Sequence, residues 1–510
     1  MNKSYRGKVQ NMDGDKPKQW NSLFYQIQKH TFILGLISMV WFLLRSGIKP
    51  SRASYPCQIV ARANSEFWLA SYFIPLTSPF QQRLPVFLNR KKTYLIVAVL
   101  FIVSAGMTVG LRYFRTSSQG PTIIKETDVG STLTEWSATL SPTSDIFVVS
   151  GTNGNDDGVE RLLGLMGSQG LKFYGSQSTG KNQGPEGLIV ADDVVVIKVN
   201  SQWNERGGTN TDLVKAIIQA ILKHPDGFTG EVIVADNGQA QYGSTGHGGS
   251  FDYTNNNAED KTQSIQTVVS SLSGSHRVST YLWDTITTKM VEEYAEADLR
   301  DGYVVNSTIN PRTGIMVSYP KFMTSYGTYI SFRDGIWDQK TGSYHSDRLK
   351  VINVPVLKTH RSYGVTACIK HYMGVPSDKL TAKLGSRTHN TIGQGSMGTL
   401  MAETRYPVLN ILDAIWVNAD PASGPITSYG RATKVNVLAA STDPVALDRW
   451  ATEEILIEAT PRGSDKRTID PNNDEPSSFG YWLKLSMQEL VSSGYQVTLD
   501  KNKINVYISR

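Results

Sequence analysis

Short apolar runs rich in valine and isoleucine recur along the chain from residue 146 onward, and most of them lead into a helical pattern. In VVVIKVN (Val194 to Asn200) apolar and polar residues do not alternate, which is typical of a strand buried on both faces of a parallel sheet. A polar loop and the amphipathic run TDLVKAIIQAILKH follow it. Runs of the same kind are Ile146–Gly151, Glu231–Ala235, Val351–His360 and Lys434–Thr442. We therefore predict an α/β fold, with a mostly parallel, doubly wound sheet and helices on both of its faces.

The predicted domain covers residues 141–510 and is interrupted near residues 240–345. This interruption is rich in Gly, Ser, Asn and Tyr, and it contains two helical patterns, near Thr262–Leu272 and Thr285–Leu299. We interpret it as an insertion or cap on the sheet.

An uncharged apolar segment, Thr93–Leu111, precedes the predicted domain. As a helix its nineteen residues would span about 28 Å, close to the thickness of the hydrocarbon core of a bilayer. Basic residues flank both ends, as expected where a helix meets the lipid headgroups: Arg90, Lys91 and Lys92 before it, and Arg112 and Arg115 after it. The sequence thus predicts a transmembrane helix at 93–111.

Charge on either side of this segment predicts its orientation. An earlier apolar run, Thr31–Leu44, has fourteen residues, so it fits either a second spanning helix or an interfacial or buried one. Residues 45–92 carry eight Lys or Arg, compared with three in the twenty residues after Leu111, and such a basic loop is expected on the cytoplasmic side. We predict a membrane protein with one or two transmembrane helices. In this prediction the first part of the chain is a tail and a basic cytoplasmic loop (1–92), followed by the transmembrane helix and a linker (112–140). The domain that follows the linker is extracytoplasmic.

Composition narrows the classes of partner. The net charge is +6, but the basic excess lies before residue 116, beside apolar segments, which argues against nucleic-acid binding. Two cysteines, Cys57 and Cys368, are too few for an iron–sulfur cluster or a Cys-rich zinc site bound by this chain alone. Any redox role would therefore need a partner protein. Cys368 lies in the apolar run GVTACI and is expected to be buried.

Polar side chains follow several of the predicted strands at the point where each strand ends. They are Lys198 and Asn200, Asp236 and Asn237, Lys358, Thr359 and His360, and Asp443. Ligands of open α/β sheets bind beyond the carboxyl ends of the strands, so we expect these groups to share one site. A lysine at an apolar strand end needs an anion or a carboxylate nearby. Lys198 is therefore either a structural partner of Asp236 or Asp443 or a ligand-binding group, and Lys358 and Lys370 have the same two interpretations.

Histidines near these strand ends raise the question of a metal. His360 or His371 with Asp236, Asp413 or Asp443 would suit a divalent cation, although no HExxH or similar spacing occurs. The cofactor therefore stays open, with a divalent metal as one candidate. His247 and His389 lie in Gly-rich loops and are predicted to be solvent-exposed.

Several blocks together resemble the family known as domain of unknown function 362. They are VVVIKVN with TDLVKAIIQAI, EVIVADNG, INVPVLKTHRSYGVTACIKHYMGV, VLNILDAI and VLAASTDPVALD, and they extend from Val194 to Glu454. The resemblance implies an α/β domain with a shared polar site and no general reaction. It places at that site Lys198, Asn200, Asp236, Lys358, His360, Thr366, Lys370, Gly374, Asp413, Asp443 and Asp448. Many members carry ferredoxin-like modules, and this chain departs from them because it has too few cysteines.

Our leading hypothesis is an enzyme that acts on a small anionic substrate. The proposed catalytic residues are Lys198, Asp236, Lys358, His360, Lys370 and Asp443; the substrate-binding residues are Asn200, Asn237, Thr359, Thr366 and Asp448; and Asp413 is a candidate metal ligand. One alternative is a non-catalytic extracytoplasmic binding module whose contact face is residues 240–345. Another is a subunit of a membrane redox complex whose partner carries the cofactor.

Overall fold

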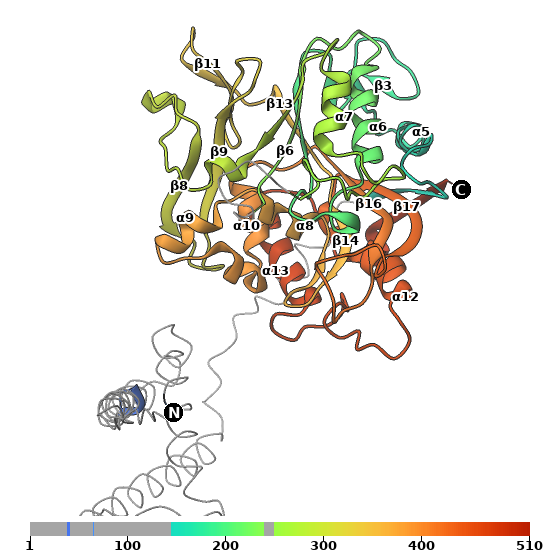
Figure 1. The fold of residues 1–510 in the computed structure, drawn as a ribbon, viewed down its shortest axis with the longest axis vertical. Helices are drawn as coiled ribbons and strands as arrows, with labels where there is room; N and C mark the ends of the chain where they lie inside the picture. Colours follow the sequence, from blue (N-terminus) through green and yellow to red (C-terminus); the bar gives the residue numbers. More distant parts are fainter. Residues whose placement is uncertain (1–37, 41–64, 66–143, 239–248, 510) are drawn as a thin grey trace, which may run out of the picture. The chain divides into compact units, whose positions relative to one another are not determined.

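A central sheet organises the part of the chain that the structure describes. The structure is a computed structural model that describes residues 38–40, 65, 144–238 and 249–509. Within these residues the sheet has ten strands in the order β18-β1-β17-β16-β13-β5-β6-β7, with β14 also beside β16 and β15 beside β14 (Figure 1). The strands are β1 Ser144–Ser150, β5 Val194–Lys198, β6 Glu231–Asp236, β7 Val278–Leu282, β13 Leu349–Asn353, β14 Val356–His360, β15 Gly364–Thr366, β16 Leu409–Asn418, β17 Thr433–Ser441 and β18 Ile504–Ser509.

The sheet is mostly parallel, as predicted, but two of its strands run in the opposite direction to their neighbours. Strands β13, β5, β6 and β7 are mutually parallel, and β16 is parallel to both β13 and β14. Strand β17 runs antiparallel to both β16 and β1, and the short β15 runs antiparallel to β14. The carboxyl end of β17 therefore lies at the edge of the sheet where its parallel neighbours begin.

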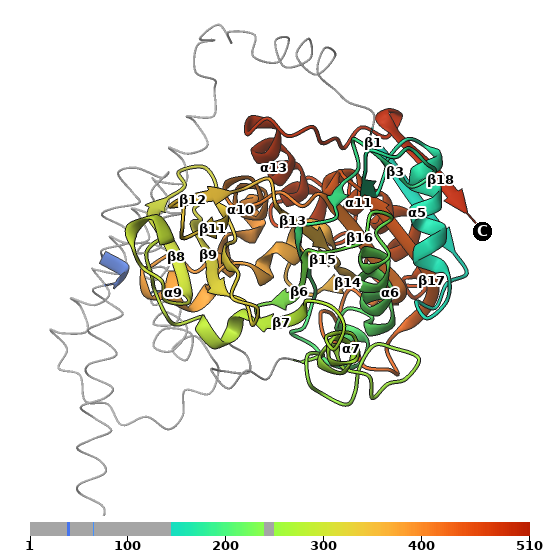
Figure 2. The ribbon, with the colours of Figure 1, turned by 90° about the horizontal axis from the view of Figure 1, so that it is seen from above.

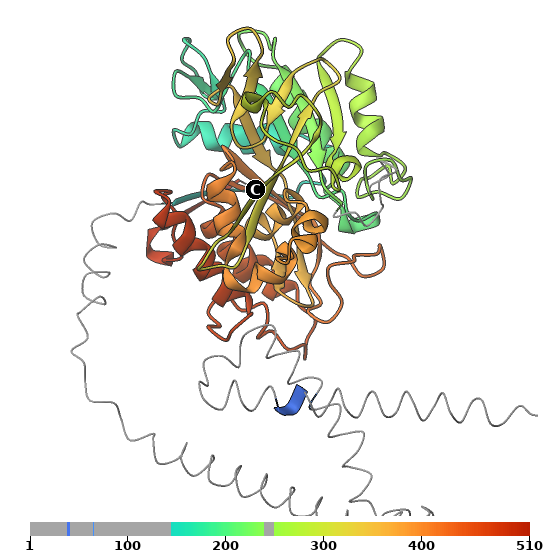
Figure 3. The same ribbon diagram turned by 90° about the vertical axis from the view of Figure 1, so that its left-hand side faces the viewer.

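Helices cover both faces of the sheet because the side chains of its strands alternate. Within β1, Ile146 and Val148 join one buried cluster, whereas Phe147 and Val149 join the other. The second cluster includes α5 Gly158–Ser168, α6 Thr211–Leu222 and α7 Ile265–Leu272. The first includes the five-stranded sheet described below and the helices α8 Cys368–His371, α9 Asp378–Lys383, α10 Ser396–Glu403, α11 Pro444–Ala451 and α13 Phe479–Ser492, with α12 Ile457–Ala459 beside it. Figure 3 shows this separation, with the green segments above the orange and red helices.

The predicted strand Val351–His360 is two strands, β13 and β14. Both pair with β16, with Ile352 opposite Leu409 and Val356 opposite Asp413. Pro355 lies between them and has no backbone N–H to donate, so the ladder is interrupted there. The interruption lets β14 extend past β13 along the same side of β16.

Residues 302–345 form an antiparallel sheet that the sequence did not predict. Its order is β12-β11-β10-β9-β8, and Figure 2 shows it at the end of the domain opposite β18. The strands are β8 Gly302–Ile309, β9 Met316–Met323, β10 Tyr329–Ser331, β11 Gly335–Asp338 and β12 Ser343–His345. A smaller sheet consists of β2 Tyr174–Gly175, β3 Gln183–Gly184 and β4 Ile189–Val190.

One of the two predicted helices in this region is confirmed and the other is wrong. The pattern at Thr262–Leu272 forms α7, but Thr285–Leu299 forms only short 3₁₀ turns. Glu293 has an extended backbone, and its buried carboxylate accepts hydrogen bonds from the hydroxyls of Tyr319 at 2.8 Å and Tyr344 at 2.6 Å. These contacts override the local helical preference. The short turns are η3 Glu205–Gly207, η4 Trp283–Ile286, η5 Tyr294–Glu296, η6 Tyr372–Gly374, η7 Thr388–Gln394, η9 Lys501–Lys503 and the π-turn η8 Thr452–Leu456.

The membrane predictions fall on other residues. The segment Thr93–Leu111, the basic loop apart from residue 65, and the linker 112–140 lie outside the described residues. Of Thr31–Leu44 only residues 38–40, which are helical, are described. Among the described residues, none of the helices combines the length and the apolar character needed to cross a bilayer.

Candidate functional site

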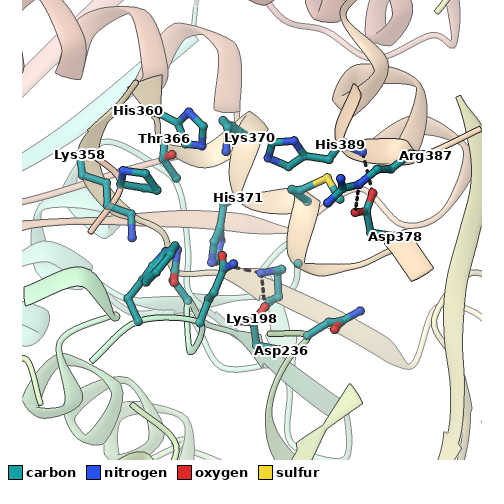
Figure 4. A pocket seen from close by; sticks show the side chains of 17 residues that line it. Lys198, Asp236, Lys358, His360, Thr366, Lys370, His371, Asp378, Arg387 and His389 are labelled. Carbon is teal, nitrogen blue, oxygen red and sulfur yellow. Dashed lines mark hydrogen bonds and ion pairs between the residues drawn. The ribbon is translucent and has the colours of Figure 1, made fainter. Parts of the chain in front are cut away.

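A cavity of about 310 Å³ lies at the carboxyl ends of β5, β6 and β14. Ligands are expected at this edge of a parallel sheet. Eight of the predicted site residues line it: Lys198, Asn200, Asp236, Asn237, Lys358, His360, Thr366 and Lys370 (Figure 4). The expectation that these groups converge on one site is therefore met for eight of the twelve residues that the sequence singled out.

The hairpin formed by β14 and β15 carries one wall of the cavity. Lys358 lies directly opposite Thr366 in this antiparallel pair, so their side chains leave the sheet on the same face. His360 follows Lys358 by two residues and shares that face. Helix α8 begins two residues after β15 and adds Lys370. Four predicted groups thus reach the cavity from one short stretch of chain.

Helix α8 is held in place by hydrogen bonds at its start and on its side. The Asp448 carboxylate accepts from the backbone N–H groups of Cys368 at 2.6 Å and Ile369 at 2.9 Å. This is the position where an anion stabilises a helix N-terminus. On the side of α8, His371 Nδ1 lies 2.7 Å from Asn353 Oδ1. Lys370 therefore projects from a fixed turn.

The ion pair between Lys198 and Asp236 forms the floor of the cavity. Lys198 Nζ lies 2.8 Å from Asp236 Oδ1 and 3.1 Å from both the Val199 carbonyl oxygen and His371 Nε2. The other oxygen of Asp236 accepts from the N–H and the hydroxyl of Ser201. Lys198 is therefore a structural partner of Asp236, and it also lines the cavity. Gly374 packs on this pair: a Cβ there would lie 2.2 Å from Asp236 Oδ1.

The hydrogen bonds of the two buried histidines assign their tautomers. Asn353 donates through its amide nitrogen to Asn410 and Cys368, so its oxygen accepts from His371 Nδ1–H and leaves His371 Nε2 to accept from Lys198. His360 Nδ1 accepts from the N–H groups of Ser362 and Tyr363, which leaves the proton on Nε2. Burial, assisted by nearby lysines, lowers the pKa of His360 to about 2 and that of His371 well below its ordinary value. Both rings are neutral at pH 7.

Burial also lowers the pKa values of the lysines. It brings the pKa of Lys370 to about 7, and it holds the pKa of Lys358 well below its usual range, with repulsion from Lys370 as a further cause. Lys358 Nζ donates to the Gly207 carbonyl oxygen at 2.5 Å. Among the described residues Lys370 Nζ has no hydrogen bond or ion pair, and its nearest recorded contact is the Tyr363 ring, 5.9 Å away. Lys370 is thus a buried amine whose polar end is unpaired.

Some of the lining residues were not predicted from the sequence as site residues. His371 was considered only as a metal ligand, and Gly374 only through the family resemblance. The others are Gln202, Trp203, Met373, Asp378, Arg387, His389 and Pro425. Arg387 Nε pairs with Asp378 Oδ2 at 2.7 Å. None of these seven residues ends a predicted strand, and that was the signal we used. The prediction that His389 is solvent-exposed is wrong, because its ring is half-buried and lies 6.1 Å from that of His360.

Comparison with known proteins identifies the stretch that carries this wall of the cavity. Residues 338–453 match the model of a family described as Domain of unknown function (DUF362). This stretch of the chain is similar to the DUF362 family. The resemblance predicted from the sequence is confirmed over this stretch, which runs from β11 into the turn that follows α11. A search of curated proteins found no match.

Four of the twelve predicted residues lie away from the cavity, all of them within residues 338–453. For three of the four, the strand direction or the hydrogen bonds explain why. Thr359 points to the opposite face of β14 from its neighbours, where its hydroxyl donates to the Asp420 carbonyl oxygen at 2.7 Å. Asp443 follows β17, the strand that runs against the others, and so it lies at the wrong edge of the sheet. Asp448 caps α8. None of these three residues lines the cavity.

Asp413, the fourth, lies within β16, and its carboxylate holds the backbone just before α6 in place. Its carboxylate accepts from the backbone N–H groups of Asn210 at 2.9 Å and Ile415 at 3.1 Å. Burial raises its pKa to about 6. In the described part of the chain, no three His, Cys, Asp or Glu side chains come together as a group that could hold a metal ion. The ligand set proposed from the sequence is thus not assembled among these residues. Cys368 is buried, as predicted.

Proposed function

We propose that the domain is an enzyme that binds a small anionic substrate in the cavity at the carboxyl ends of β5, β6 and β14. The observation that carries the proposal is an excess of basic side chains over acidic ones. Four cationic side chains line the cavity against two carboxylates, and those carboxylates are already paired, Asp236 with Lys198 and Asp378 with Arg387. Neither Lys358 nor Lys370 has a carboxylate within ion-pair distance in the described ranges.

A buried cation without a counter-ion is unfavourable, and a bound anion would relieve that cost. Two further polar atoms in the cavity are buried without a hydrogen-bond partner among the described residues, Thr366 Oγ1 and Asn200 Oδ1. Native proteins leave few such atoms unpaired, and a ligand is one way to satisfy them. The cavity volume of about 310 Å³ is at the lower end of the range for small-molecule sites.

In this proposal Lys358 and Thr366 bind the anionic group of the substrate. Lys198 holds the Asp236 carboxylate in position, and His360 presents its Nε2–H as a hydrogen-bond donor to a polarised oxygen. Asp413 and Asp443 have no role in it. The proposal keeps the membrane anchor predicted from Thr93–Leu111, which would tether this domain on the outer side of a bilayer.

Titration of the purified full chain with small anions tests the proposal. Calorimetry with phosphate, acetate, lactate and pyruvate would measure affinity, and mass spectrometry of the same mixtures would detect turnover. Lys358→Met should weaken binding of the preferred anion about tenfold or more, because a charge-assisted hydrogen bond contributes about 1.5–3 kcal/mol. Lys223→Met removes the same charge from an exposed position at the end of α6 and should leave binding unchanged.

The outcome separates this proposal from the alternatives. Failure of all these anions to bind would refute it. Tight binding without any turnover across a broad set of carboxylates and phosphates would favour the non-catalytic binding module instead. Turnover that appears only when an electron-transfer partner is added would favour the redox subunit.

A further inference from the structure

We propose that Lys370 forms a covalent imine with the substrate, so that the substrate is a small carboxylate that also carries an aldehyde or ketone group. This inference rests on the proposed function, because it assigns a chemical class to the anion that binds in the same cavity.

The hydrogen bonds of the three buried lysines distinguish their roles. Lys198 Nζ has three acceptors, in Val199, Asp236 and His371, so all of its N–H groups are engaged. Lys358 Nζ donates to the carbonyl oxygen of Gly207. Lys370 Nζ has neither a hydrogen bond nor an ion pair within the part of the chain that the structure describes. A nucleophilic amine must be able to turn its lone pair toward the substrate, and of these three lysines Lys370 is the one that no polar contact within the described residues holds in another direction.

The surroundings of Lys370 favour its neutral form. Figure 4 shows the side chain between the rings of His360 and His389, and the Tyr363 ring lies 5.9 Å from Nζ. These neighbours carry no negative charge that would stabilise an ammonium ion. Burial brings the pKa of Lys370 to about 7, so a substantial fraction of the molecules holds the free amine at neutral pH. Desolvation in a buried pocket is a known way to activate a lysine nucleophile.

The other cavity groups match the remaining parts of such a substrate. Lys358 and Thr366 lie opposite one another on the hairpin and can bind the carboxylate together. Nearby, His360 Nε2–H can donate to the carbonyl oxygen as negative charge develops on it. The backbone that carries Lys370 is anchored by Asp448 and Asn353, so the amine is held in position before the substrate binds.

The condensation balances without any further reagent. The Lys370 ammonium releases a proton to water in the cavity, and the Nζ lone pair then forms a bond to the carbonyl carbon while the C=O π pair moves to oxygen. The oxygen takes up a proton from the nitrogen to give a carbinolamine. Its hydroxyl leaves as water with the proton first released, and the nitrogen lone pair forms the C=N bond. The net change converts one ammonium and one carbonyl into one iminium and one water.

Reductive trapping tests the inference directly. The purified full chain would be incubated with sodium cyanoborohydride and with glyoxylate, pyruvate or 2-oxoglutarate, and peptide mapping would locate any secondary amine. We expect Lys370 to be labelled about tenfold faster than any other lysine, with a rate that rises as the pH increases through about 7. Lactate resembles pyruvate but lacks the carbonyl, so it should bind without labelling.

Two variants serve as controls. Lys370→Arg keeps the positive charge and should abolish the rapid label, whereas Lys223→Arg should label Lys370 as the wild type does. If the arginine variant fails to fold, the rate of labelling at Lys370 relative to the other lysines of the wild type still decides the question.

Absence of a Lys370 label with all three oxo acids would overturn the inference. If calorimetry then still detects binding of these acids, the proposed function stands without the imine. If no small anion binds at all, the proposed function fails as well.

Discussion

Buried charged side chains occur at both edges of the central sheet, and their hydrogen bonds differ. At the edge where the parallel strands begin, the Asp443 carboxylate accepts from four groups: the N–H groups of Val445, Ala446 and Thr498 and the hydroxyl of Ser144. At the opposite edge, Lys370 Nζ and Thr366 Oγ1 are buried without a polar partner among the described residues. Burial and charge alone therefore do not mark a site. What separates the two edges is whether the protein itself satisfies its polar atoms.

The largest expected effect tests the structural role of the Asp443 edge. Asp443→Ala removes the N-cap of α11 and leaves several buried N–H groups unpaired, which should lower the free energy of unfolding by about 3–5 kcal/mol. Chemical denaturation of the full chain measures this. The folded fraction should still bind the preferred anion with unchanged affinity. Asp443→Asn keeps an acceptor for the helix cap and should be much milder. If Asp443→Asn lost anion affinity without losing stability, Asp443 would not have the purely structural role that separates its edge of the sheet from the cavity.

Replacing Lys370 should have a smaller effect of the opposite sign on stability. Because its pKa falls from an ordinary 10.5 to about 7 on folding, the unfolded chain binds more protons between those pH values. The free-energy cost of burying this amine is therefore greatest below pH 7, and it decreases as the pH rises toward 10.5. We expect Lys370→Met to be more stable than the wild type by about 2 kcal/mol at pH 6, with the difference shrinking above pH 7. Urea denaturation at several pH values measures it, and a difference that does not depend on pH would show that Lys370 is solvated.

A pair of threonines on the hairpin gives the smallest and sharpest comparison. Thr359→Val removes a hydroxyl that donates to the Asp420 carbonyl oxygen, and it should cost about 1 kcal/mol of stability with no change in anion affinity. Thr366→Val removes an unpartnered hydroxyl, so stability should change by less than about 0.5 kcal/mol while anion affinity falls about fivefold. Thermal denaturation and calorimetry measure both quantities. Equal losses of stability in the two variants would remove the distinction between a structural and a ligand-binding hydroxyl.

Much of the main sheet could be predicted because its strands are continuous apolar runs. The runs around Val194, Glu231 and Lys434 each became a strand close to the expected bounds. The sequence could not predict that β17 runs antiparallel to its neighbours, because a continuous apolar run does not indicate the direction of the adjacent strands. The antiparallel sheet at 302–345 was missed for another reason. Its stability comes from contacts distant in sequence, such as the buried Glu293 carboxylate, and not from a local pattern.

The candidate site was predictable where it depended on strand ends. Lys198, Asp236 and Lys358 end or lie near the end of parallel strands, and the topology brings them together as expected. The position of Thr359 could have been foreseen, since side chains alternate along a strand and Thr359 lies between Lys358 and His360. Arg387 and His389 lie in and beside a 3₁₀ turn whose position depends on tertiary packing, so no local pattern pointed to them.

The hairpin of β14 and β15 makes several cavity groups depend on a single register. Lys358, His360 and Thr366 keep their relative heights only because the turn between the strands has one particular length. Insertion of a single residue in that turn, for instance after Ser362, would leave Lys358 and His360 in place while turning Thr366 to the far side and shifting the start of α8. A change in the length of this turn would therefore rearrange the whole wall of the cavity at once.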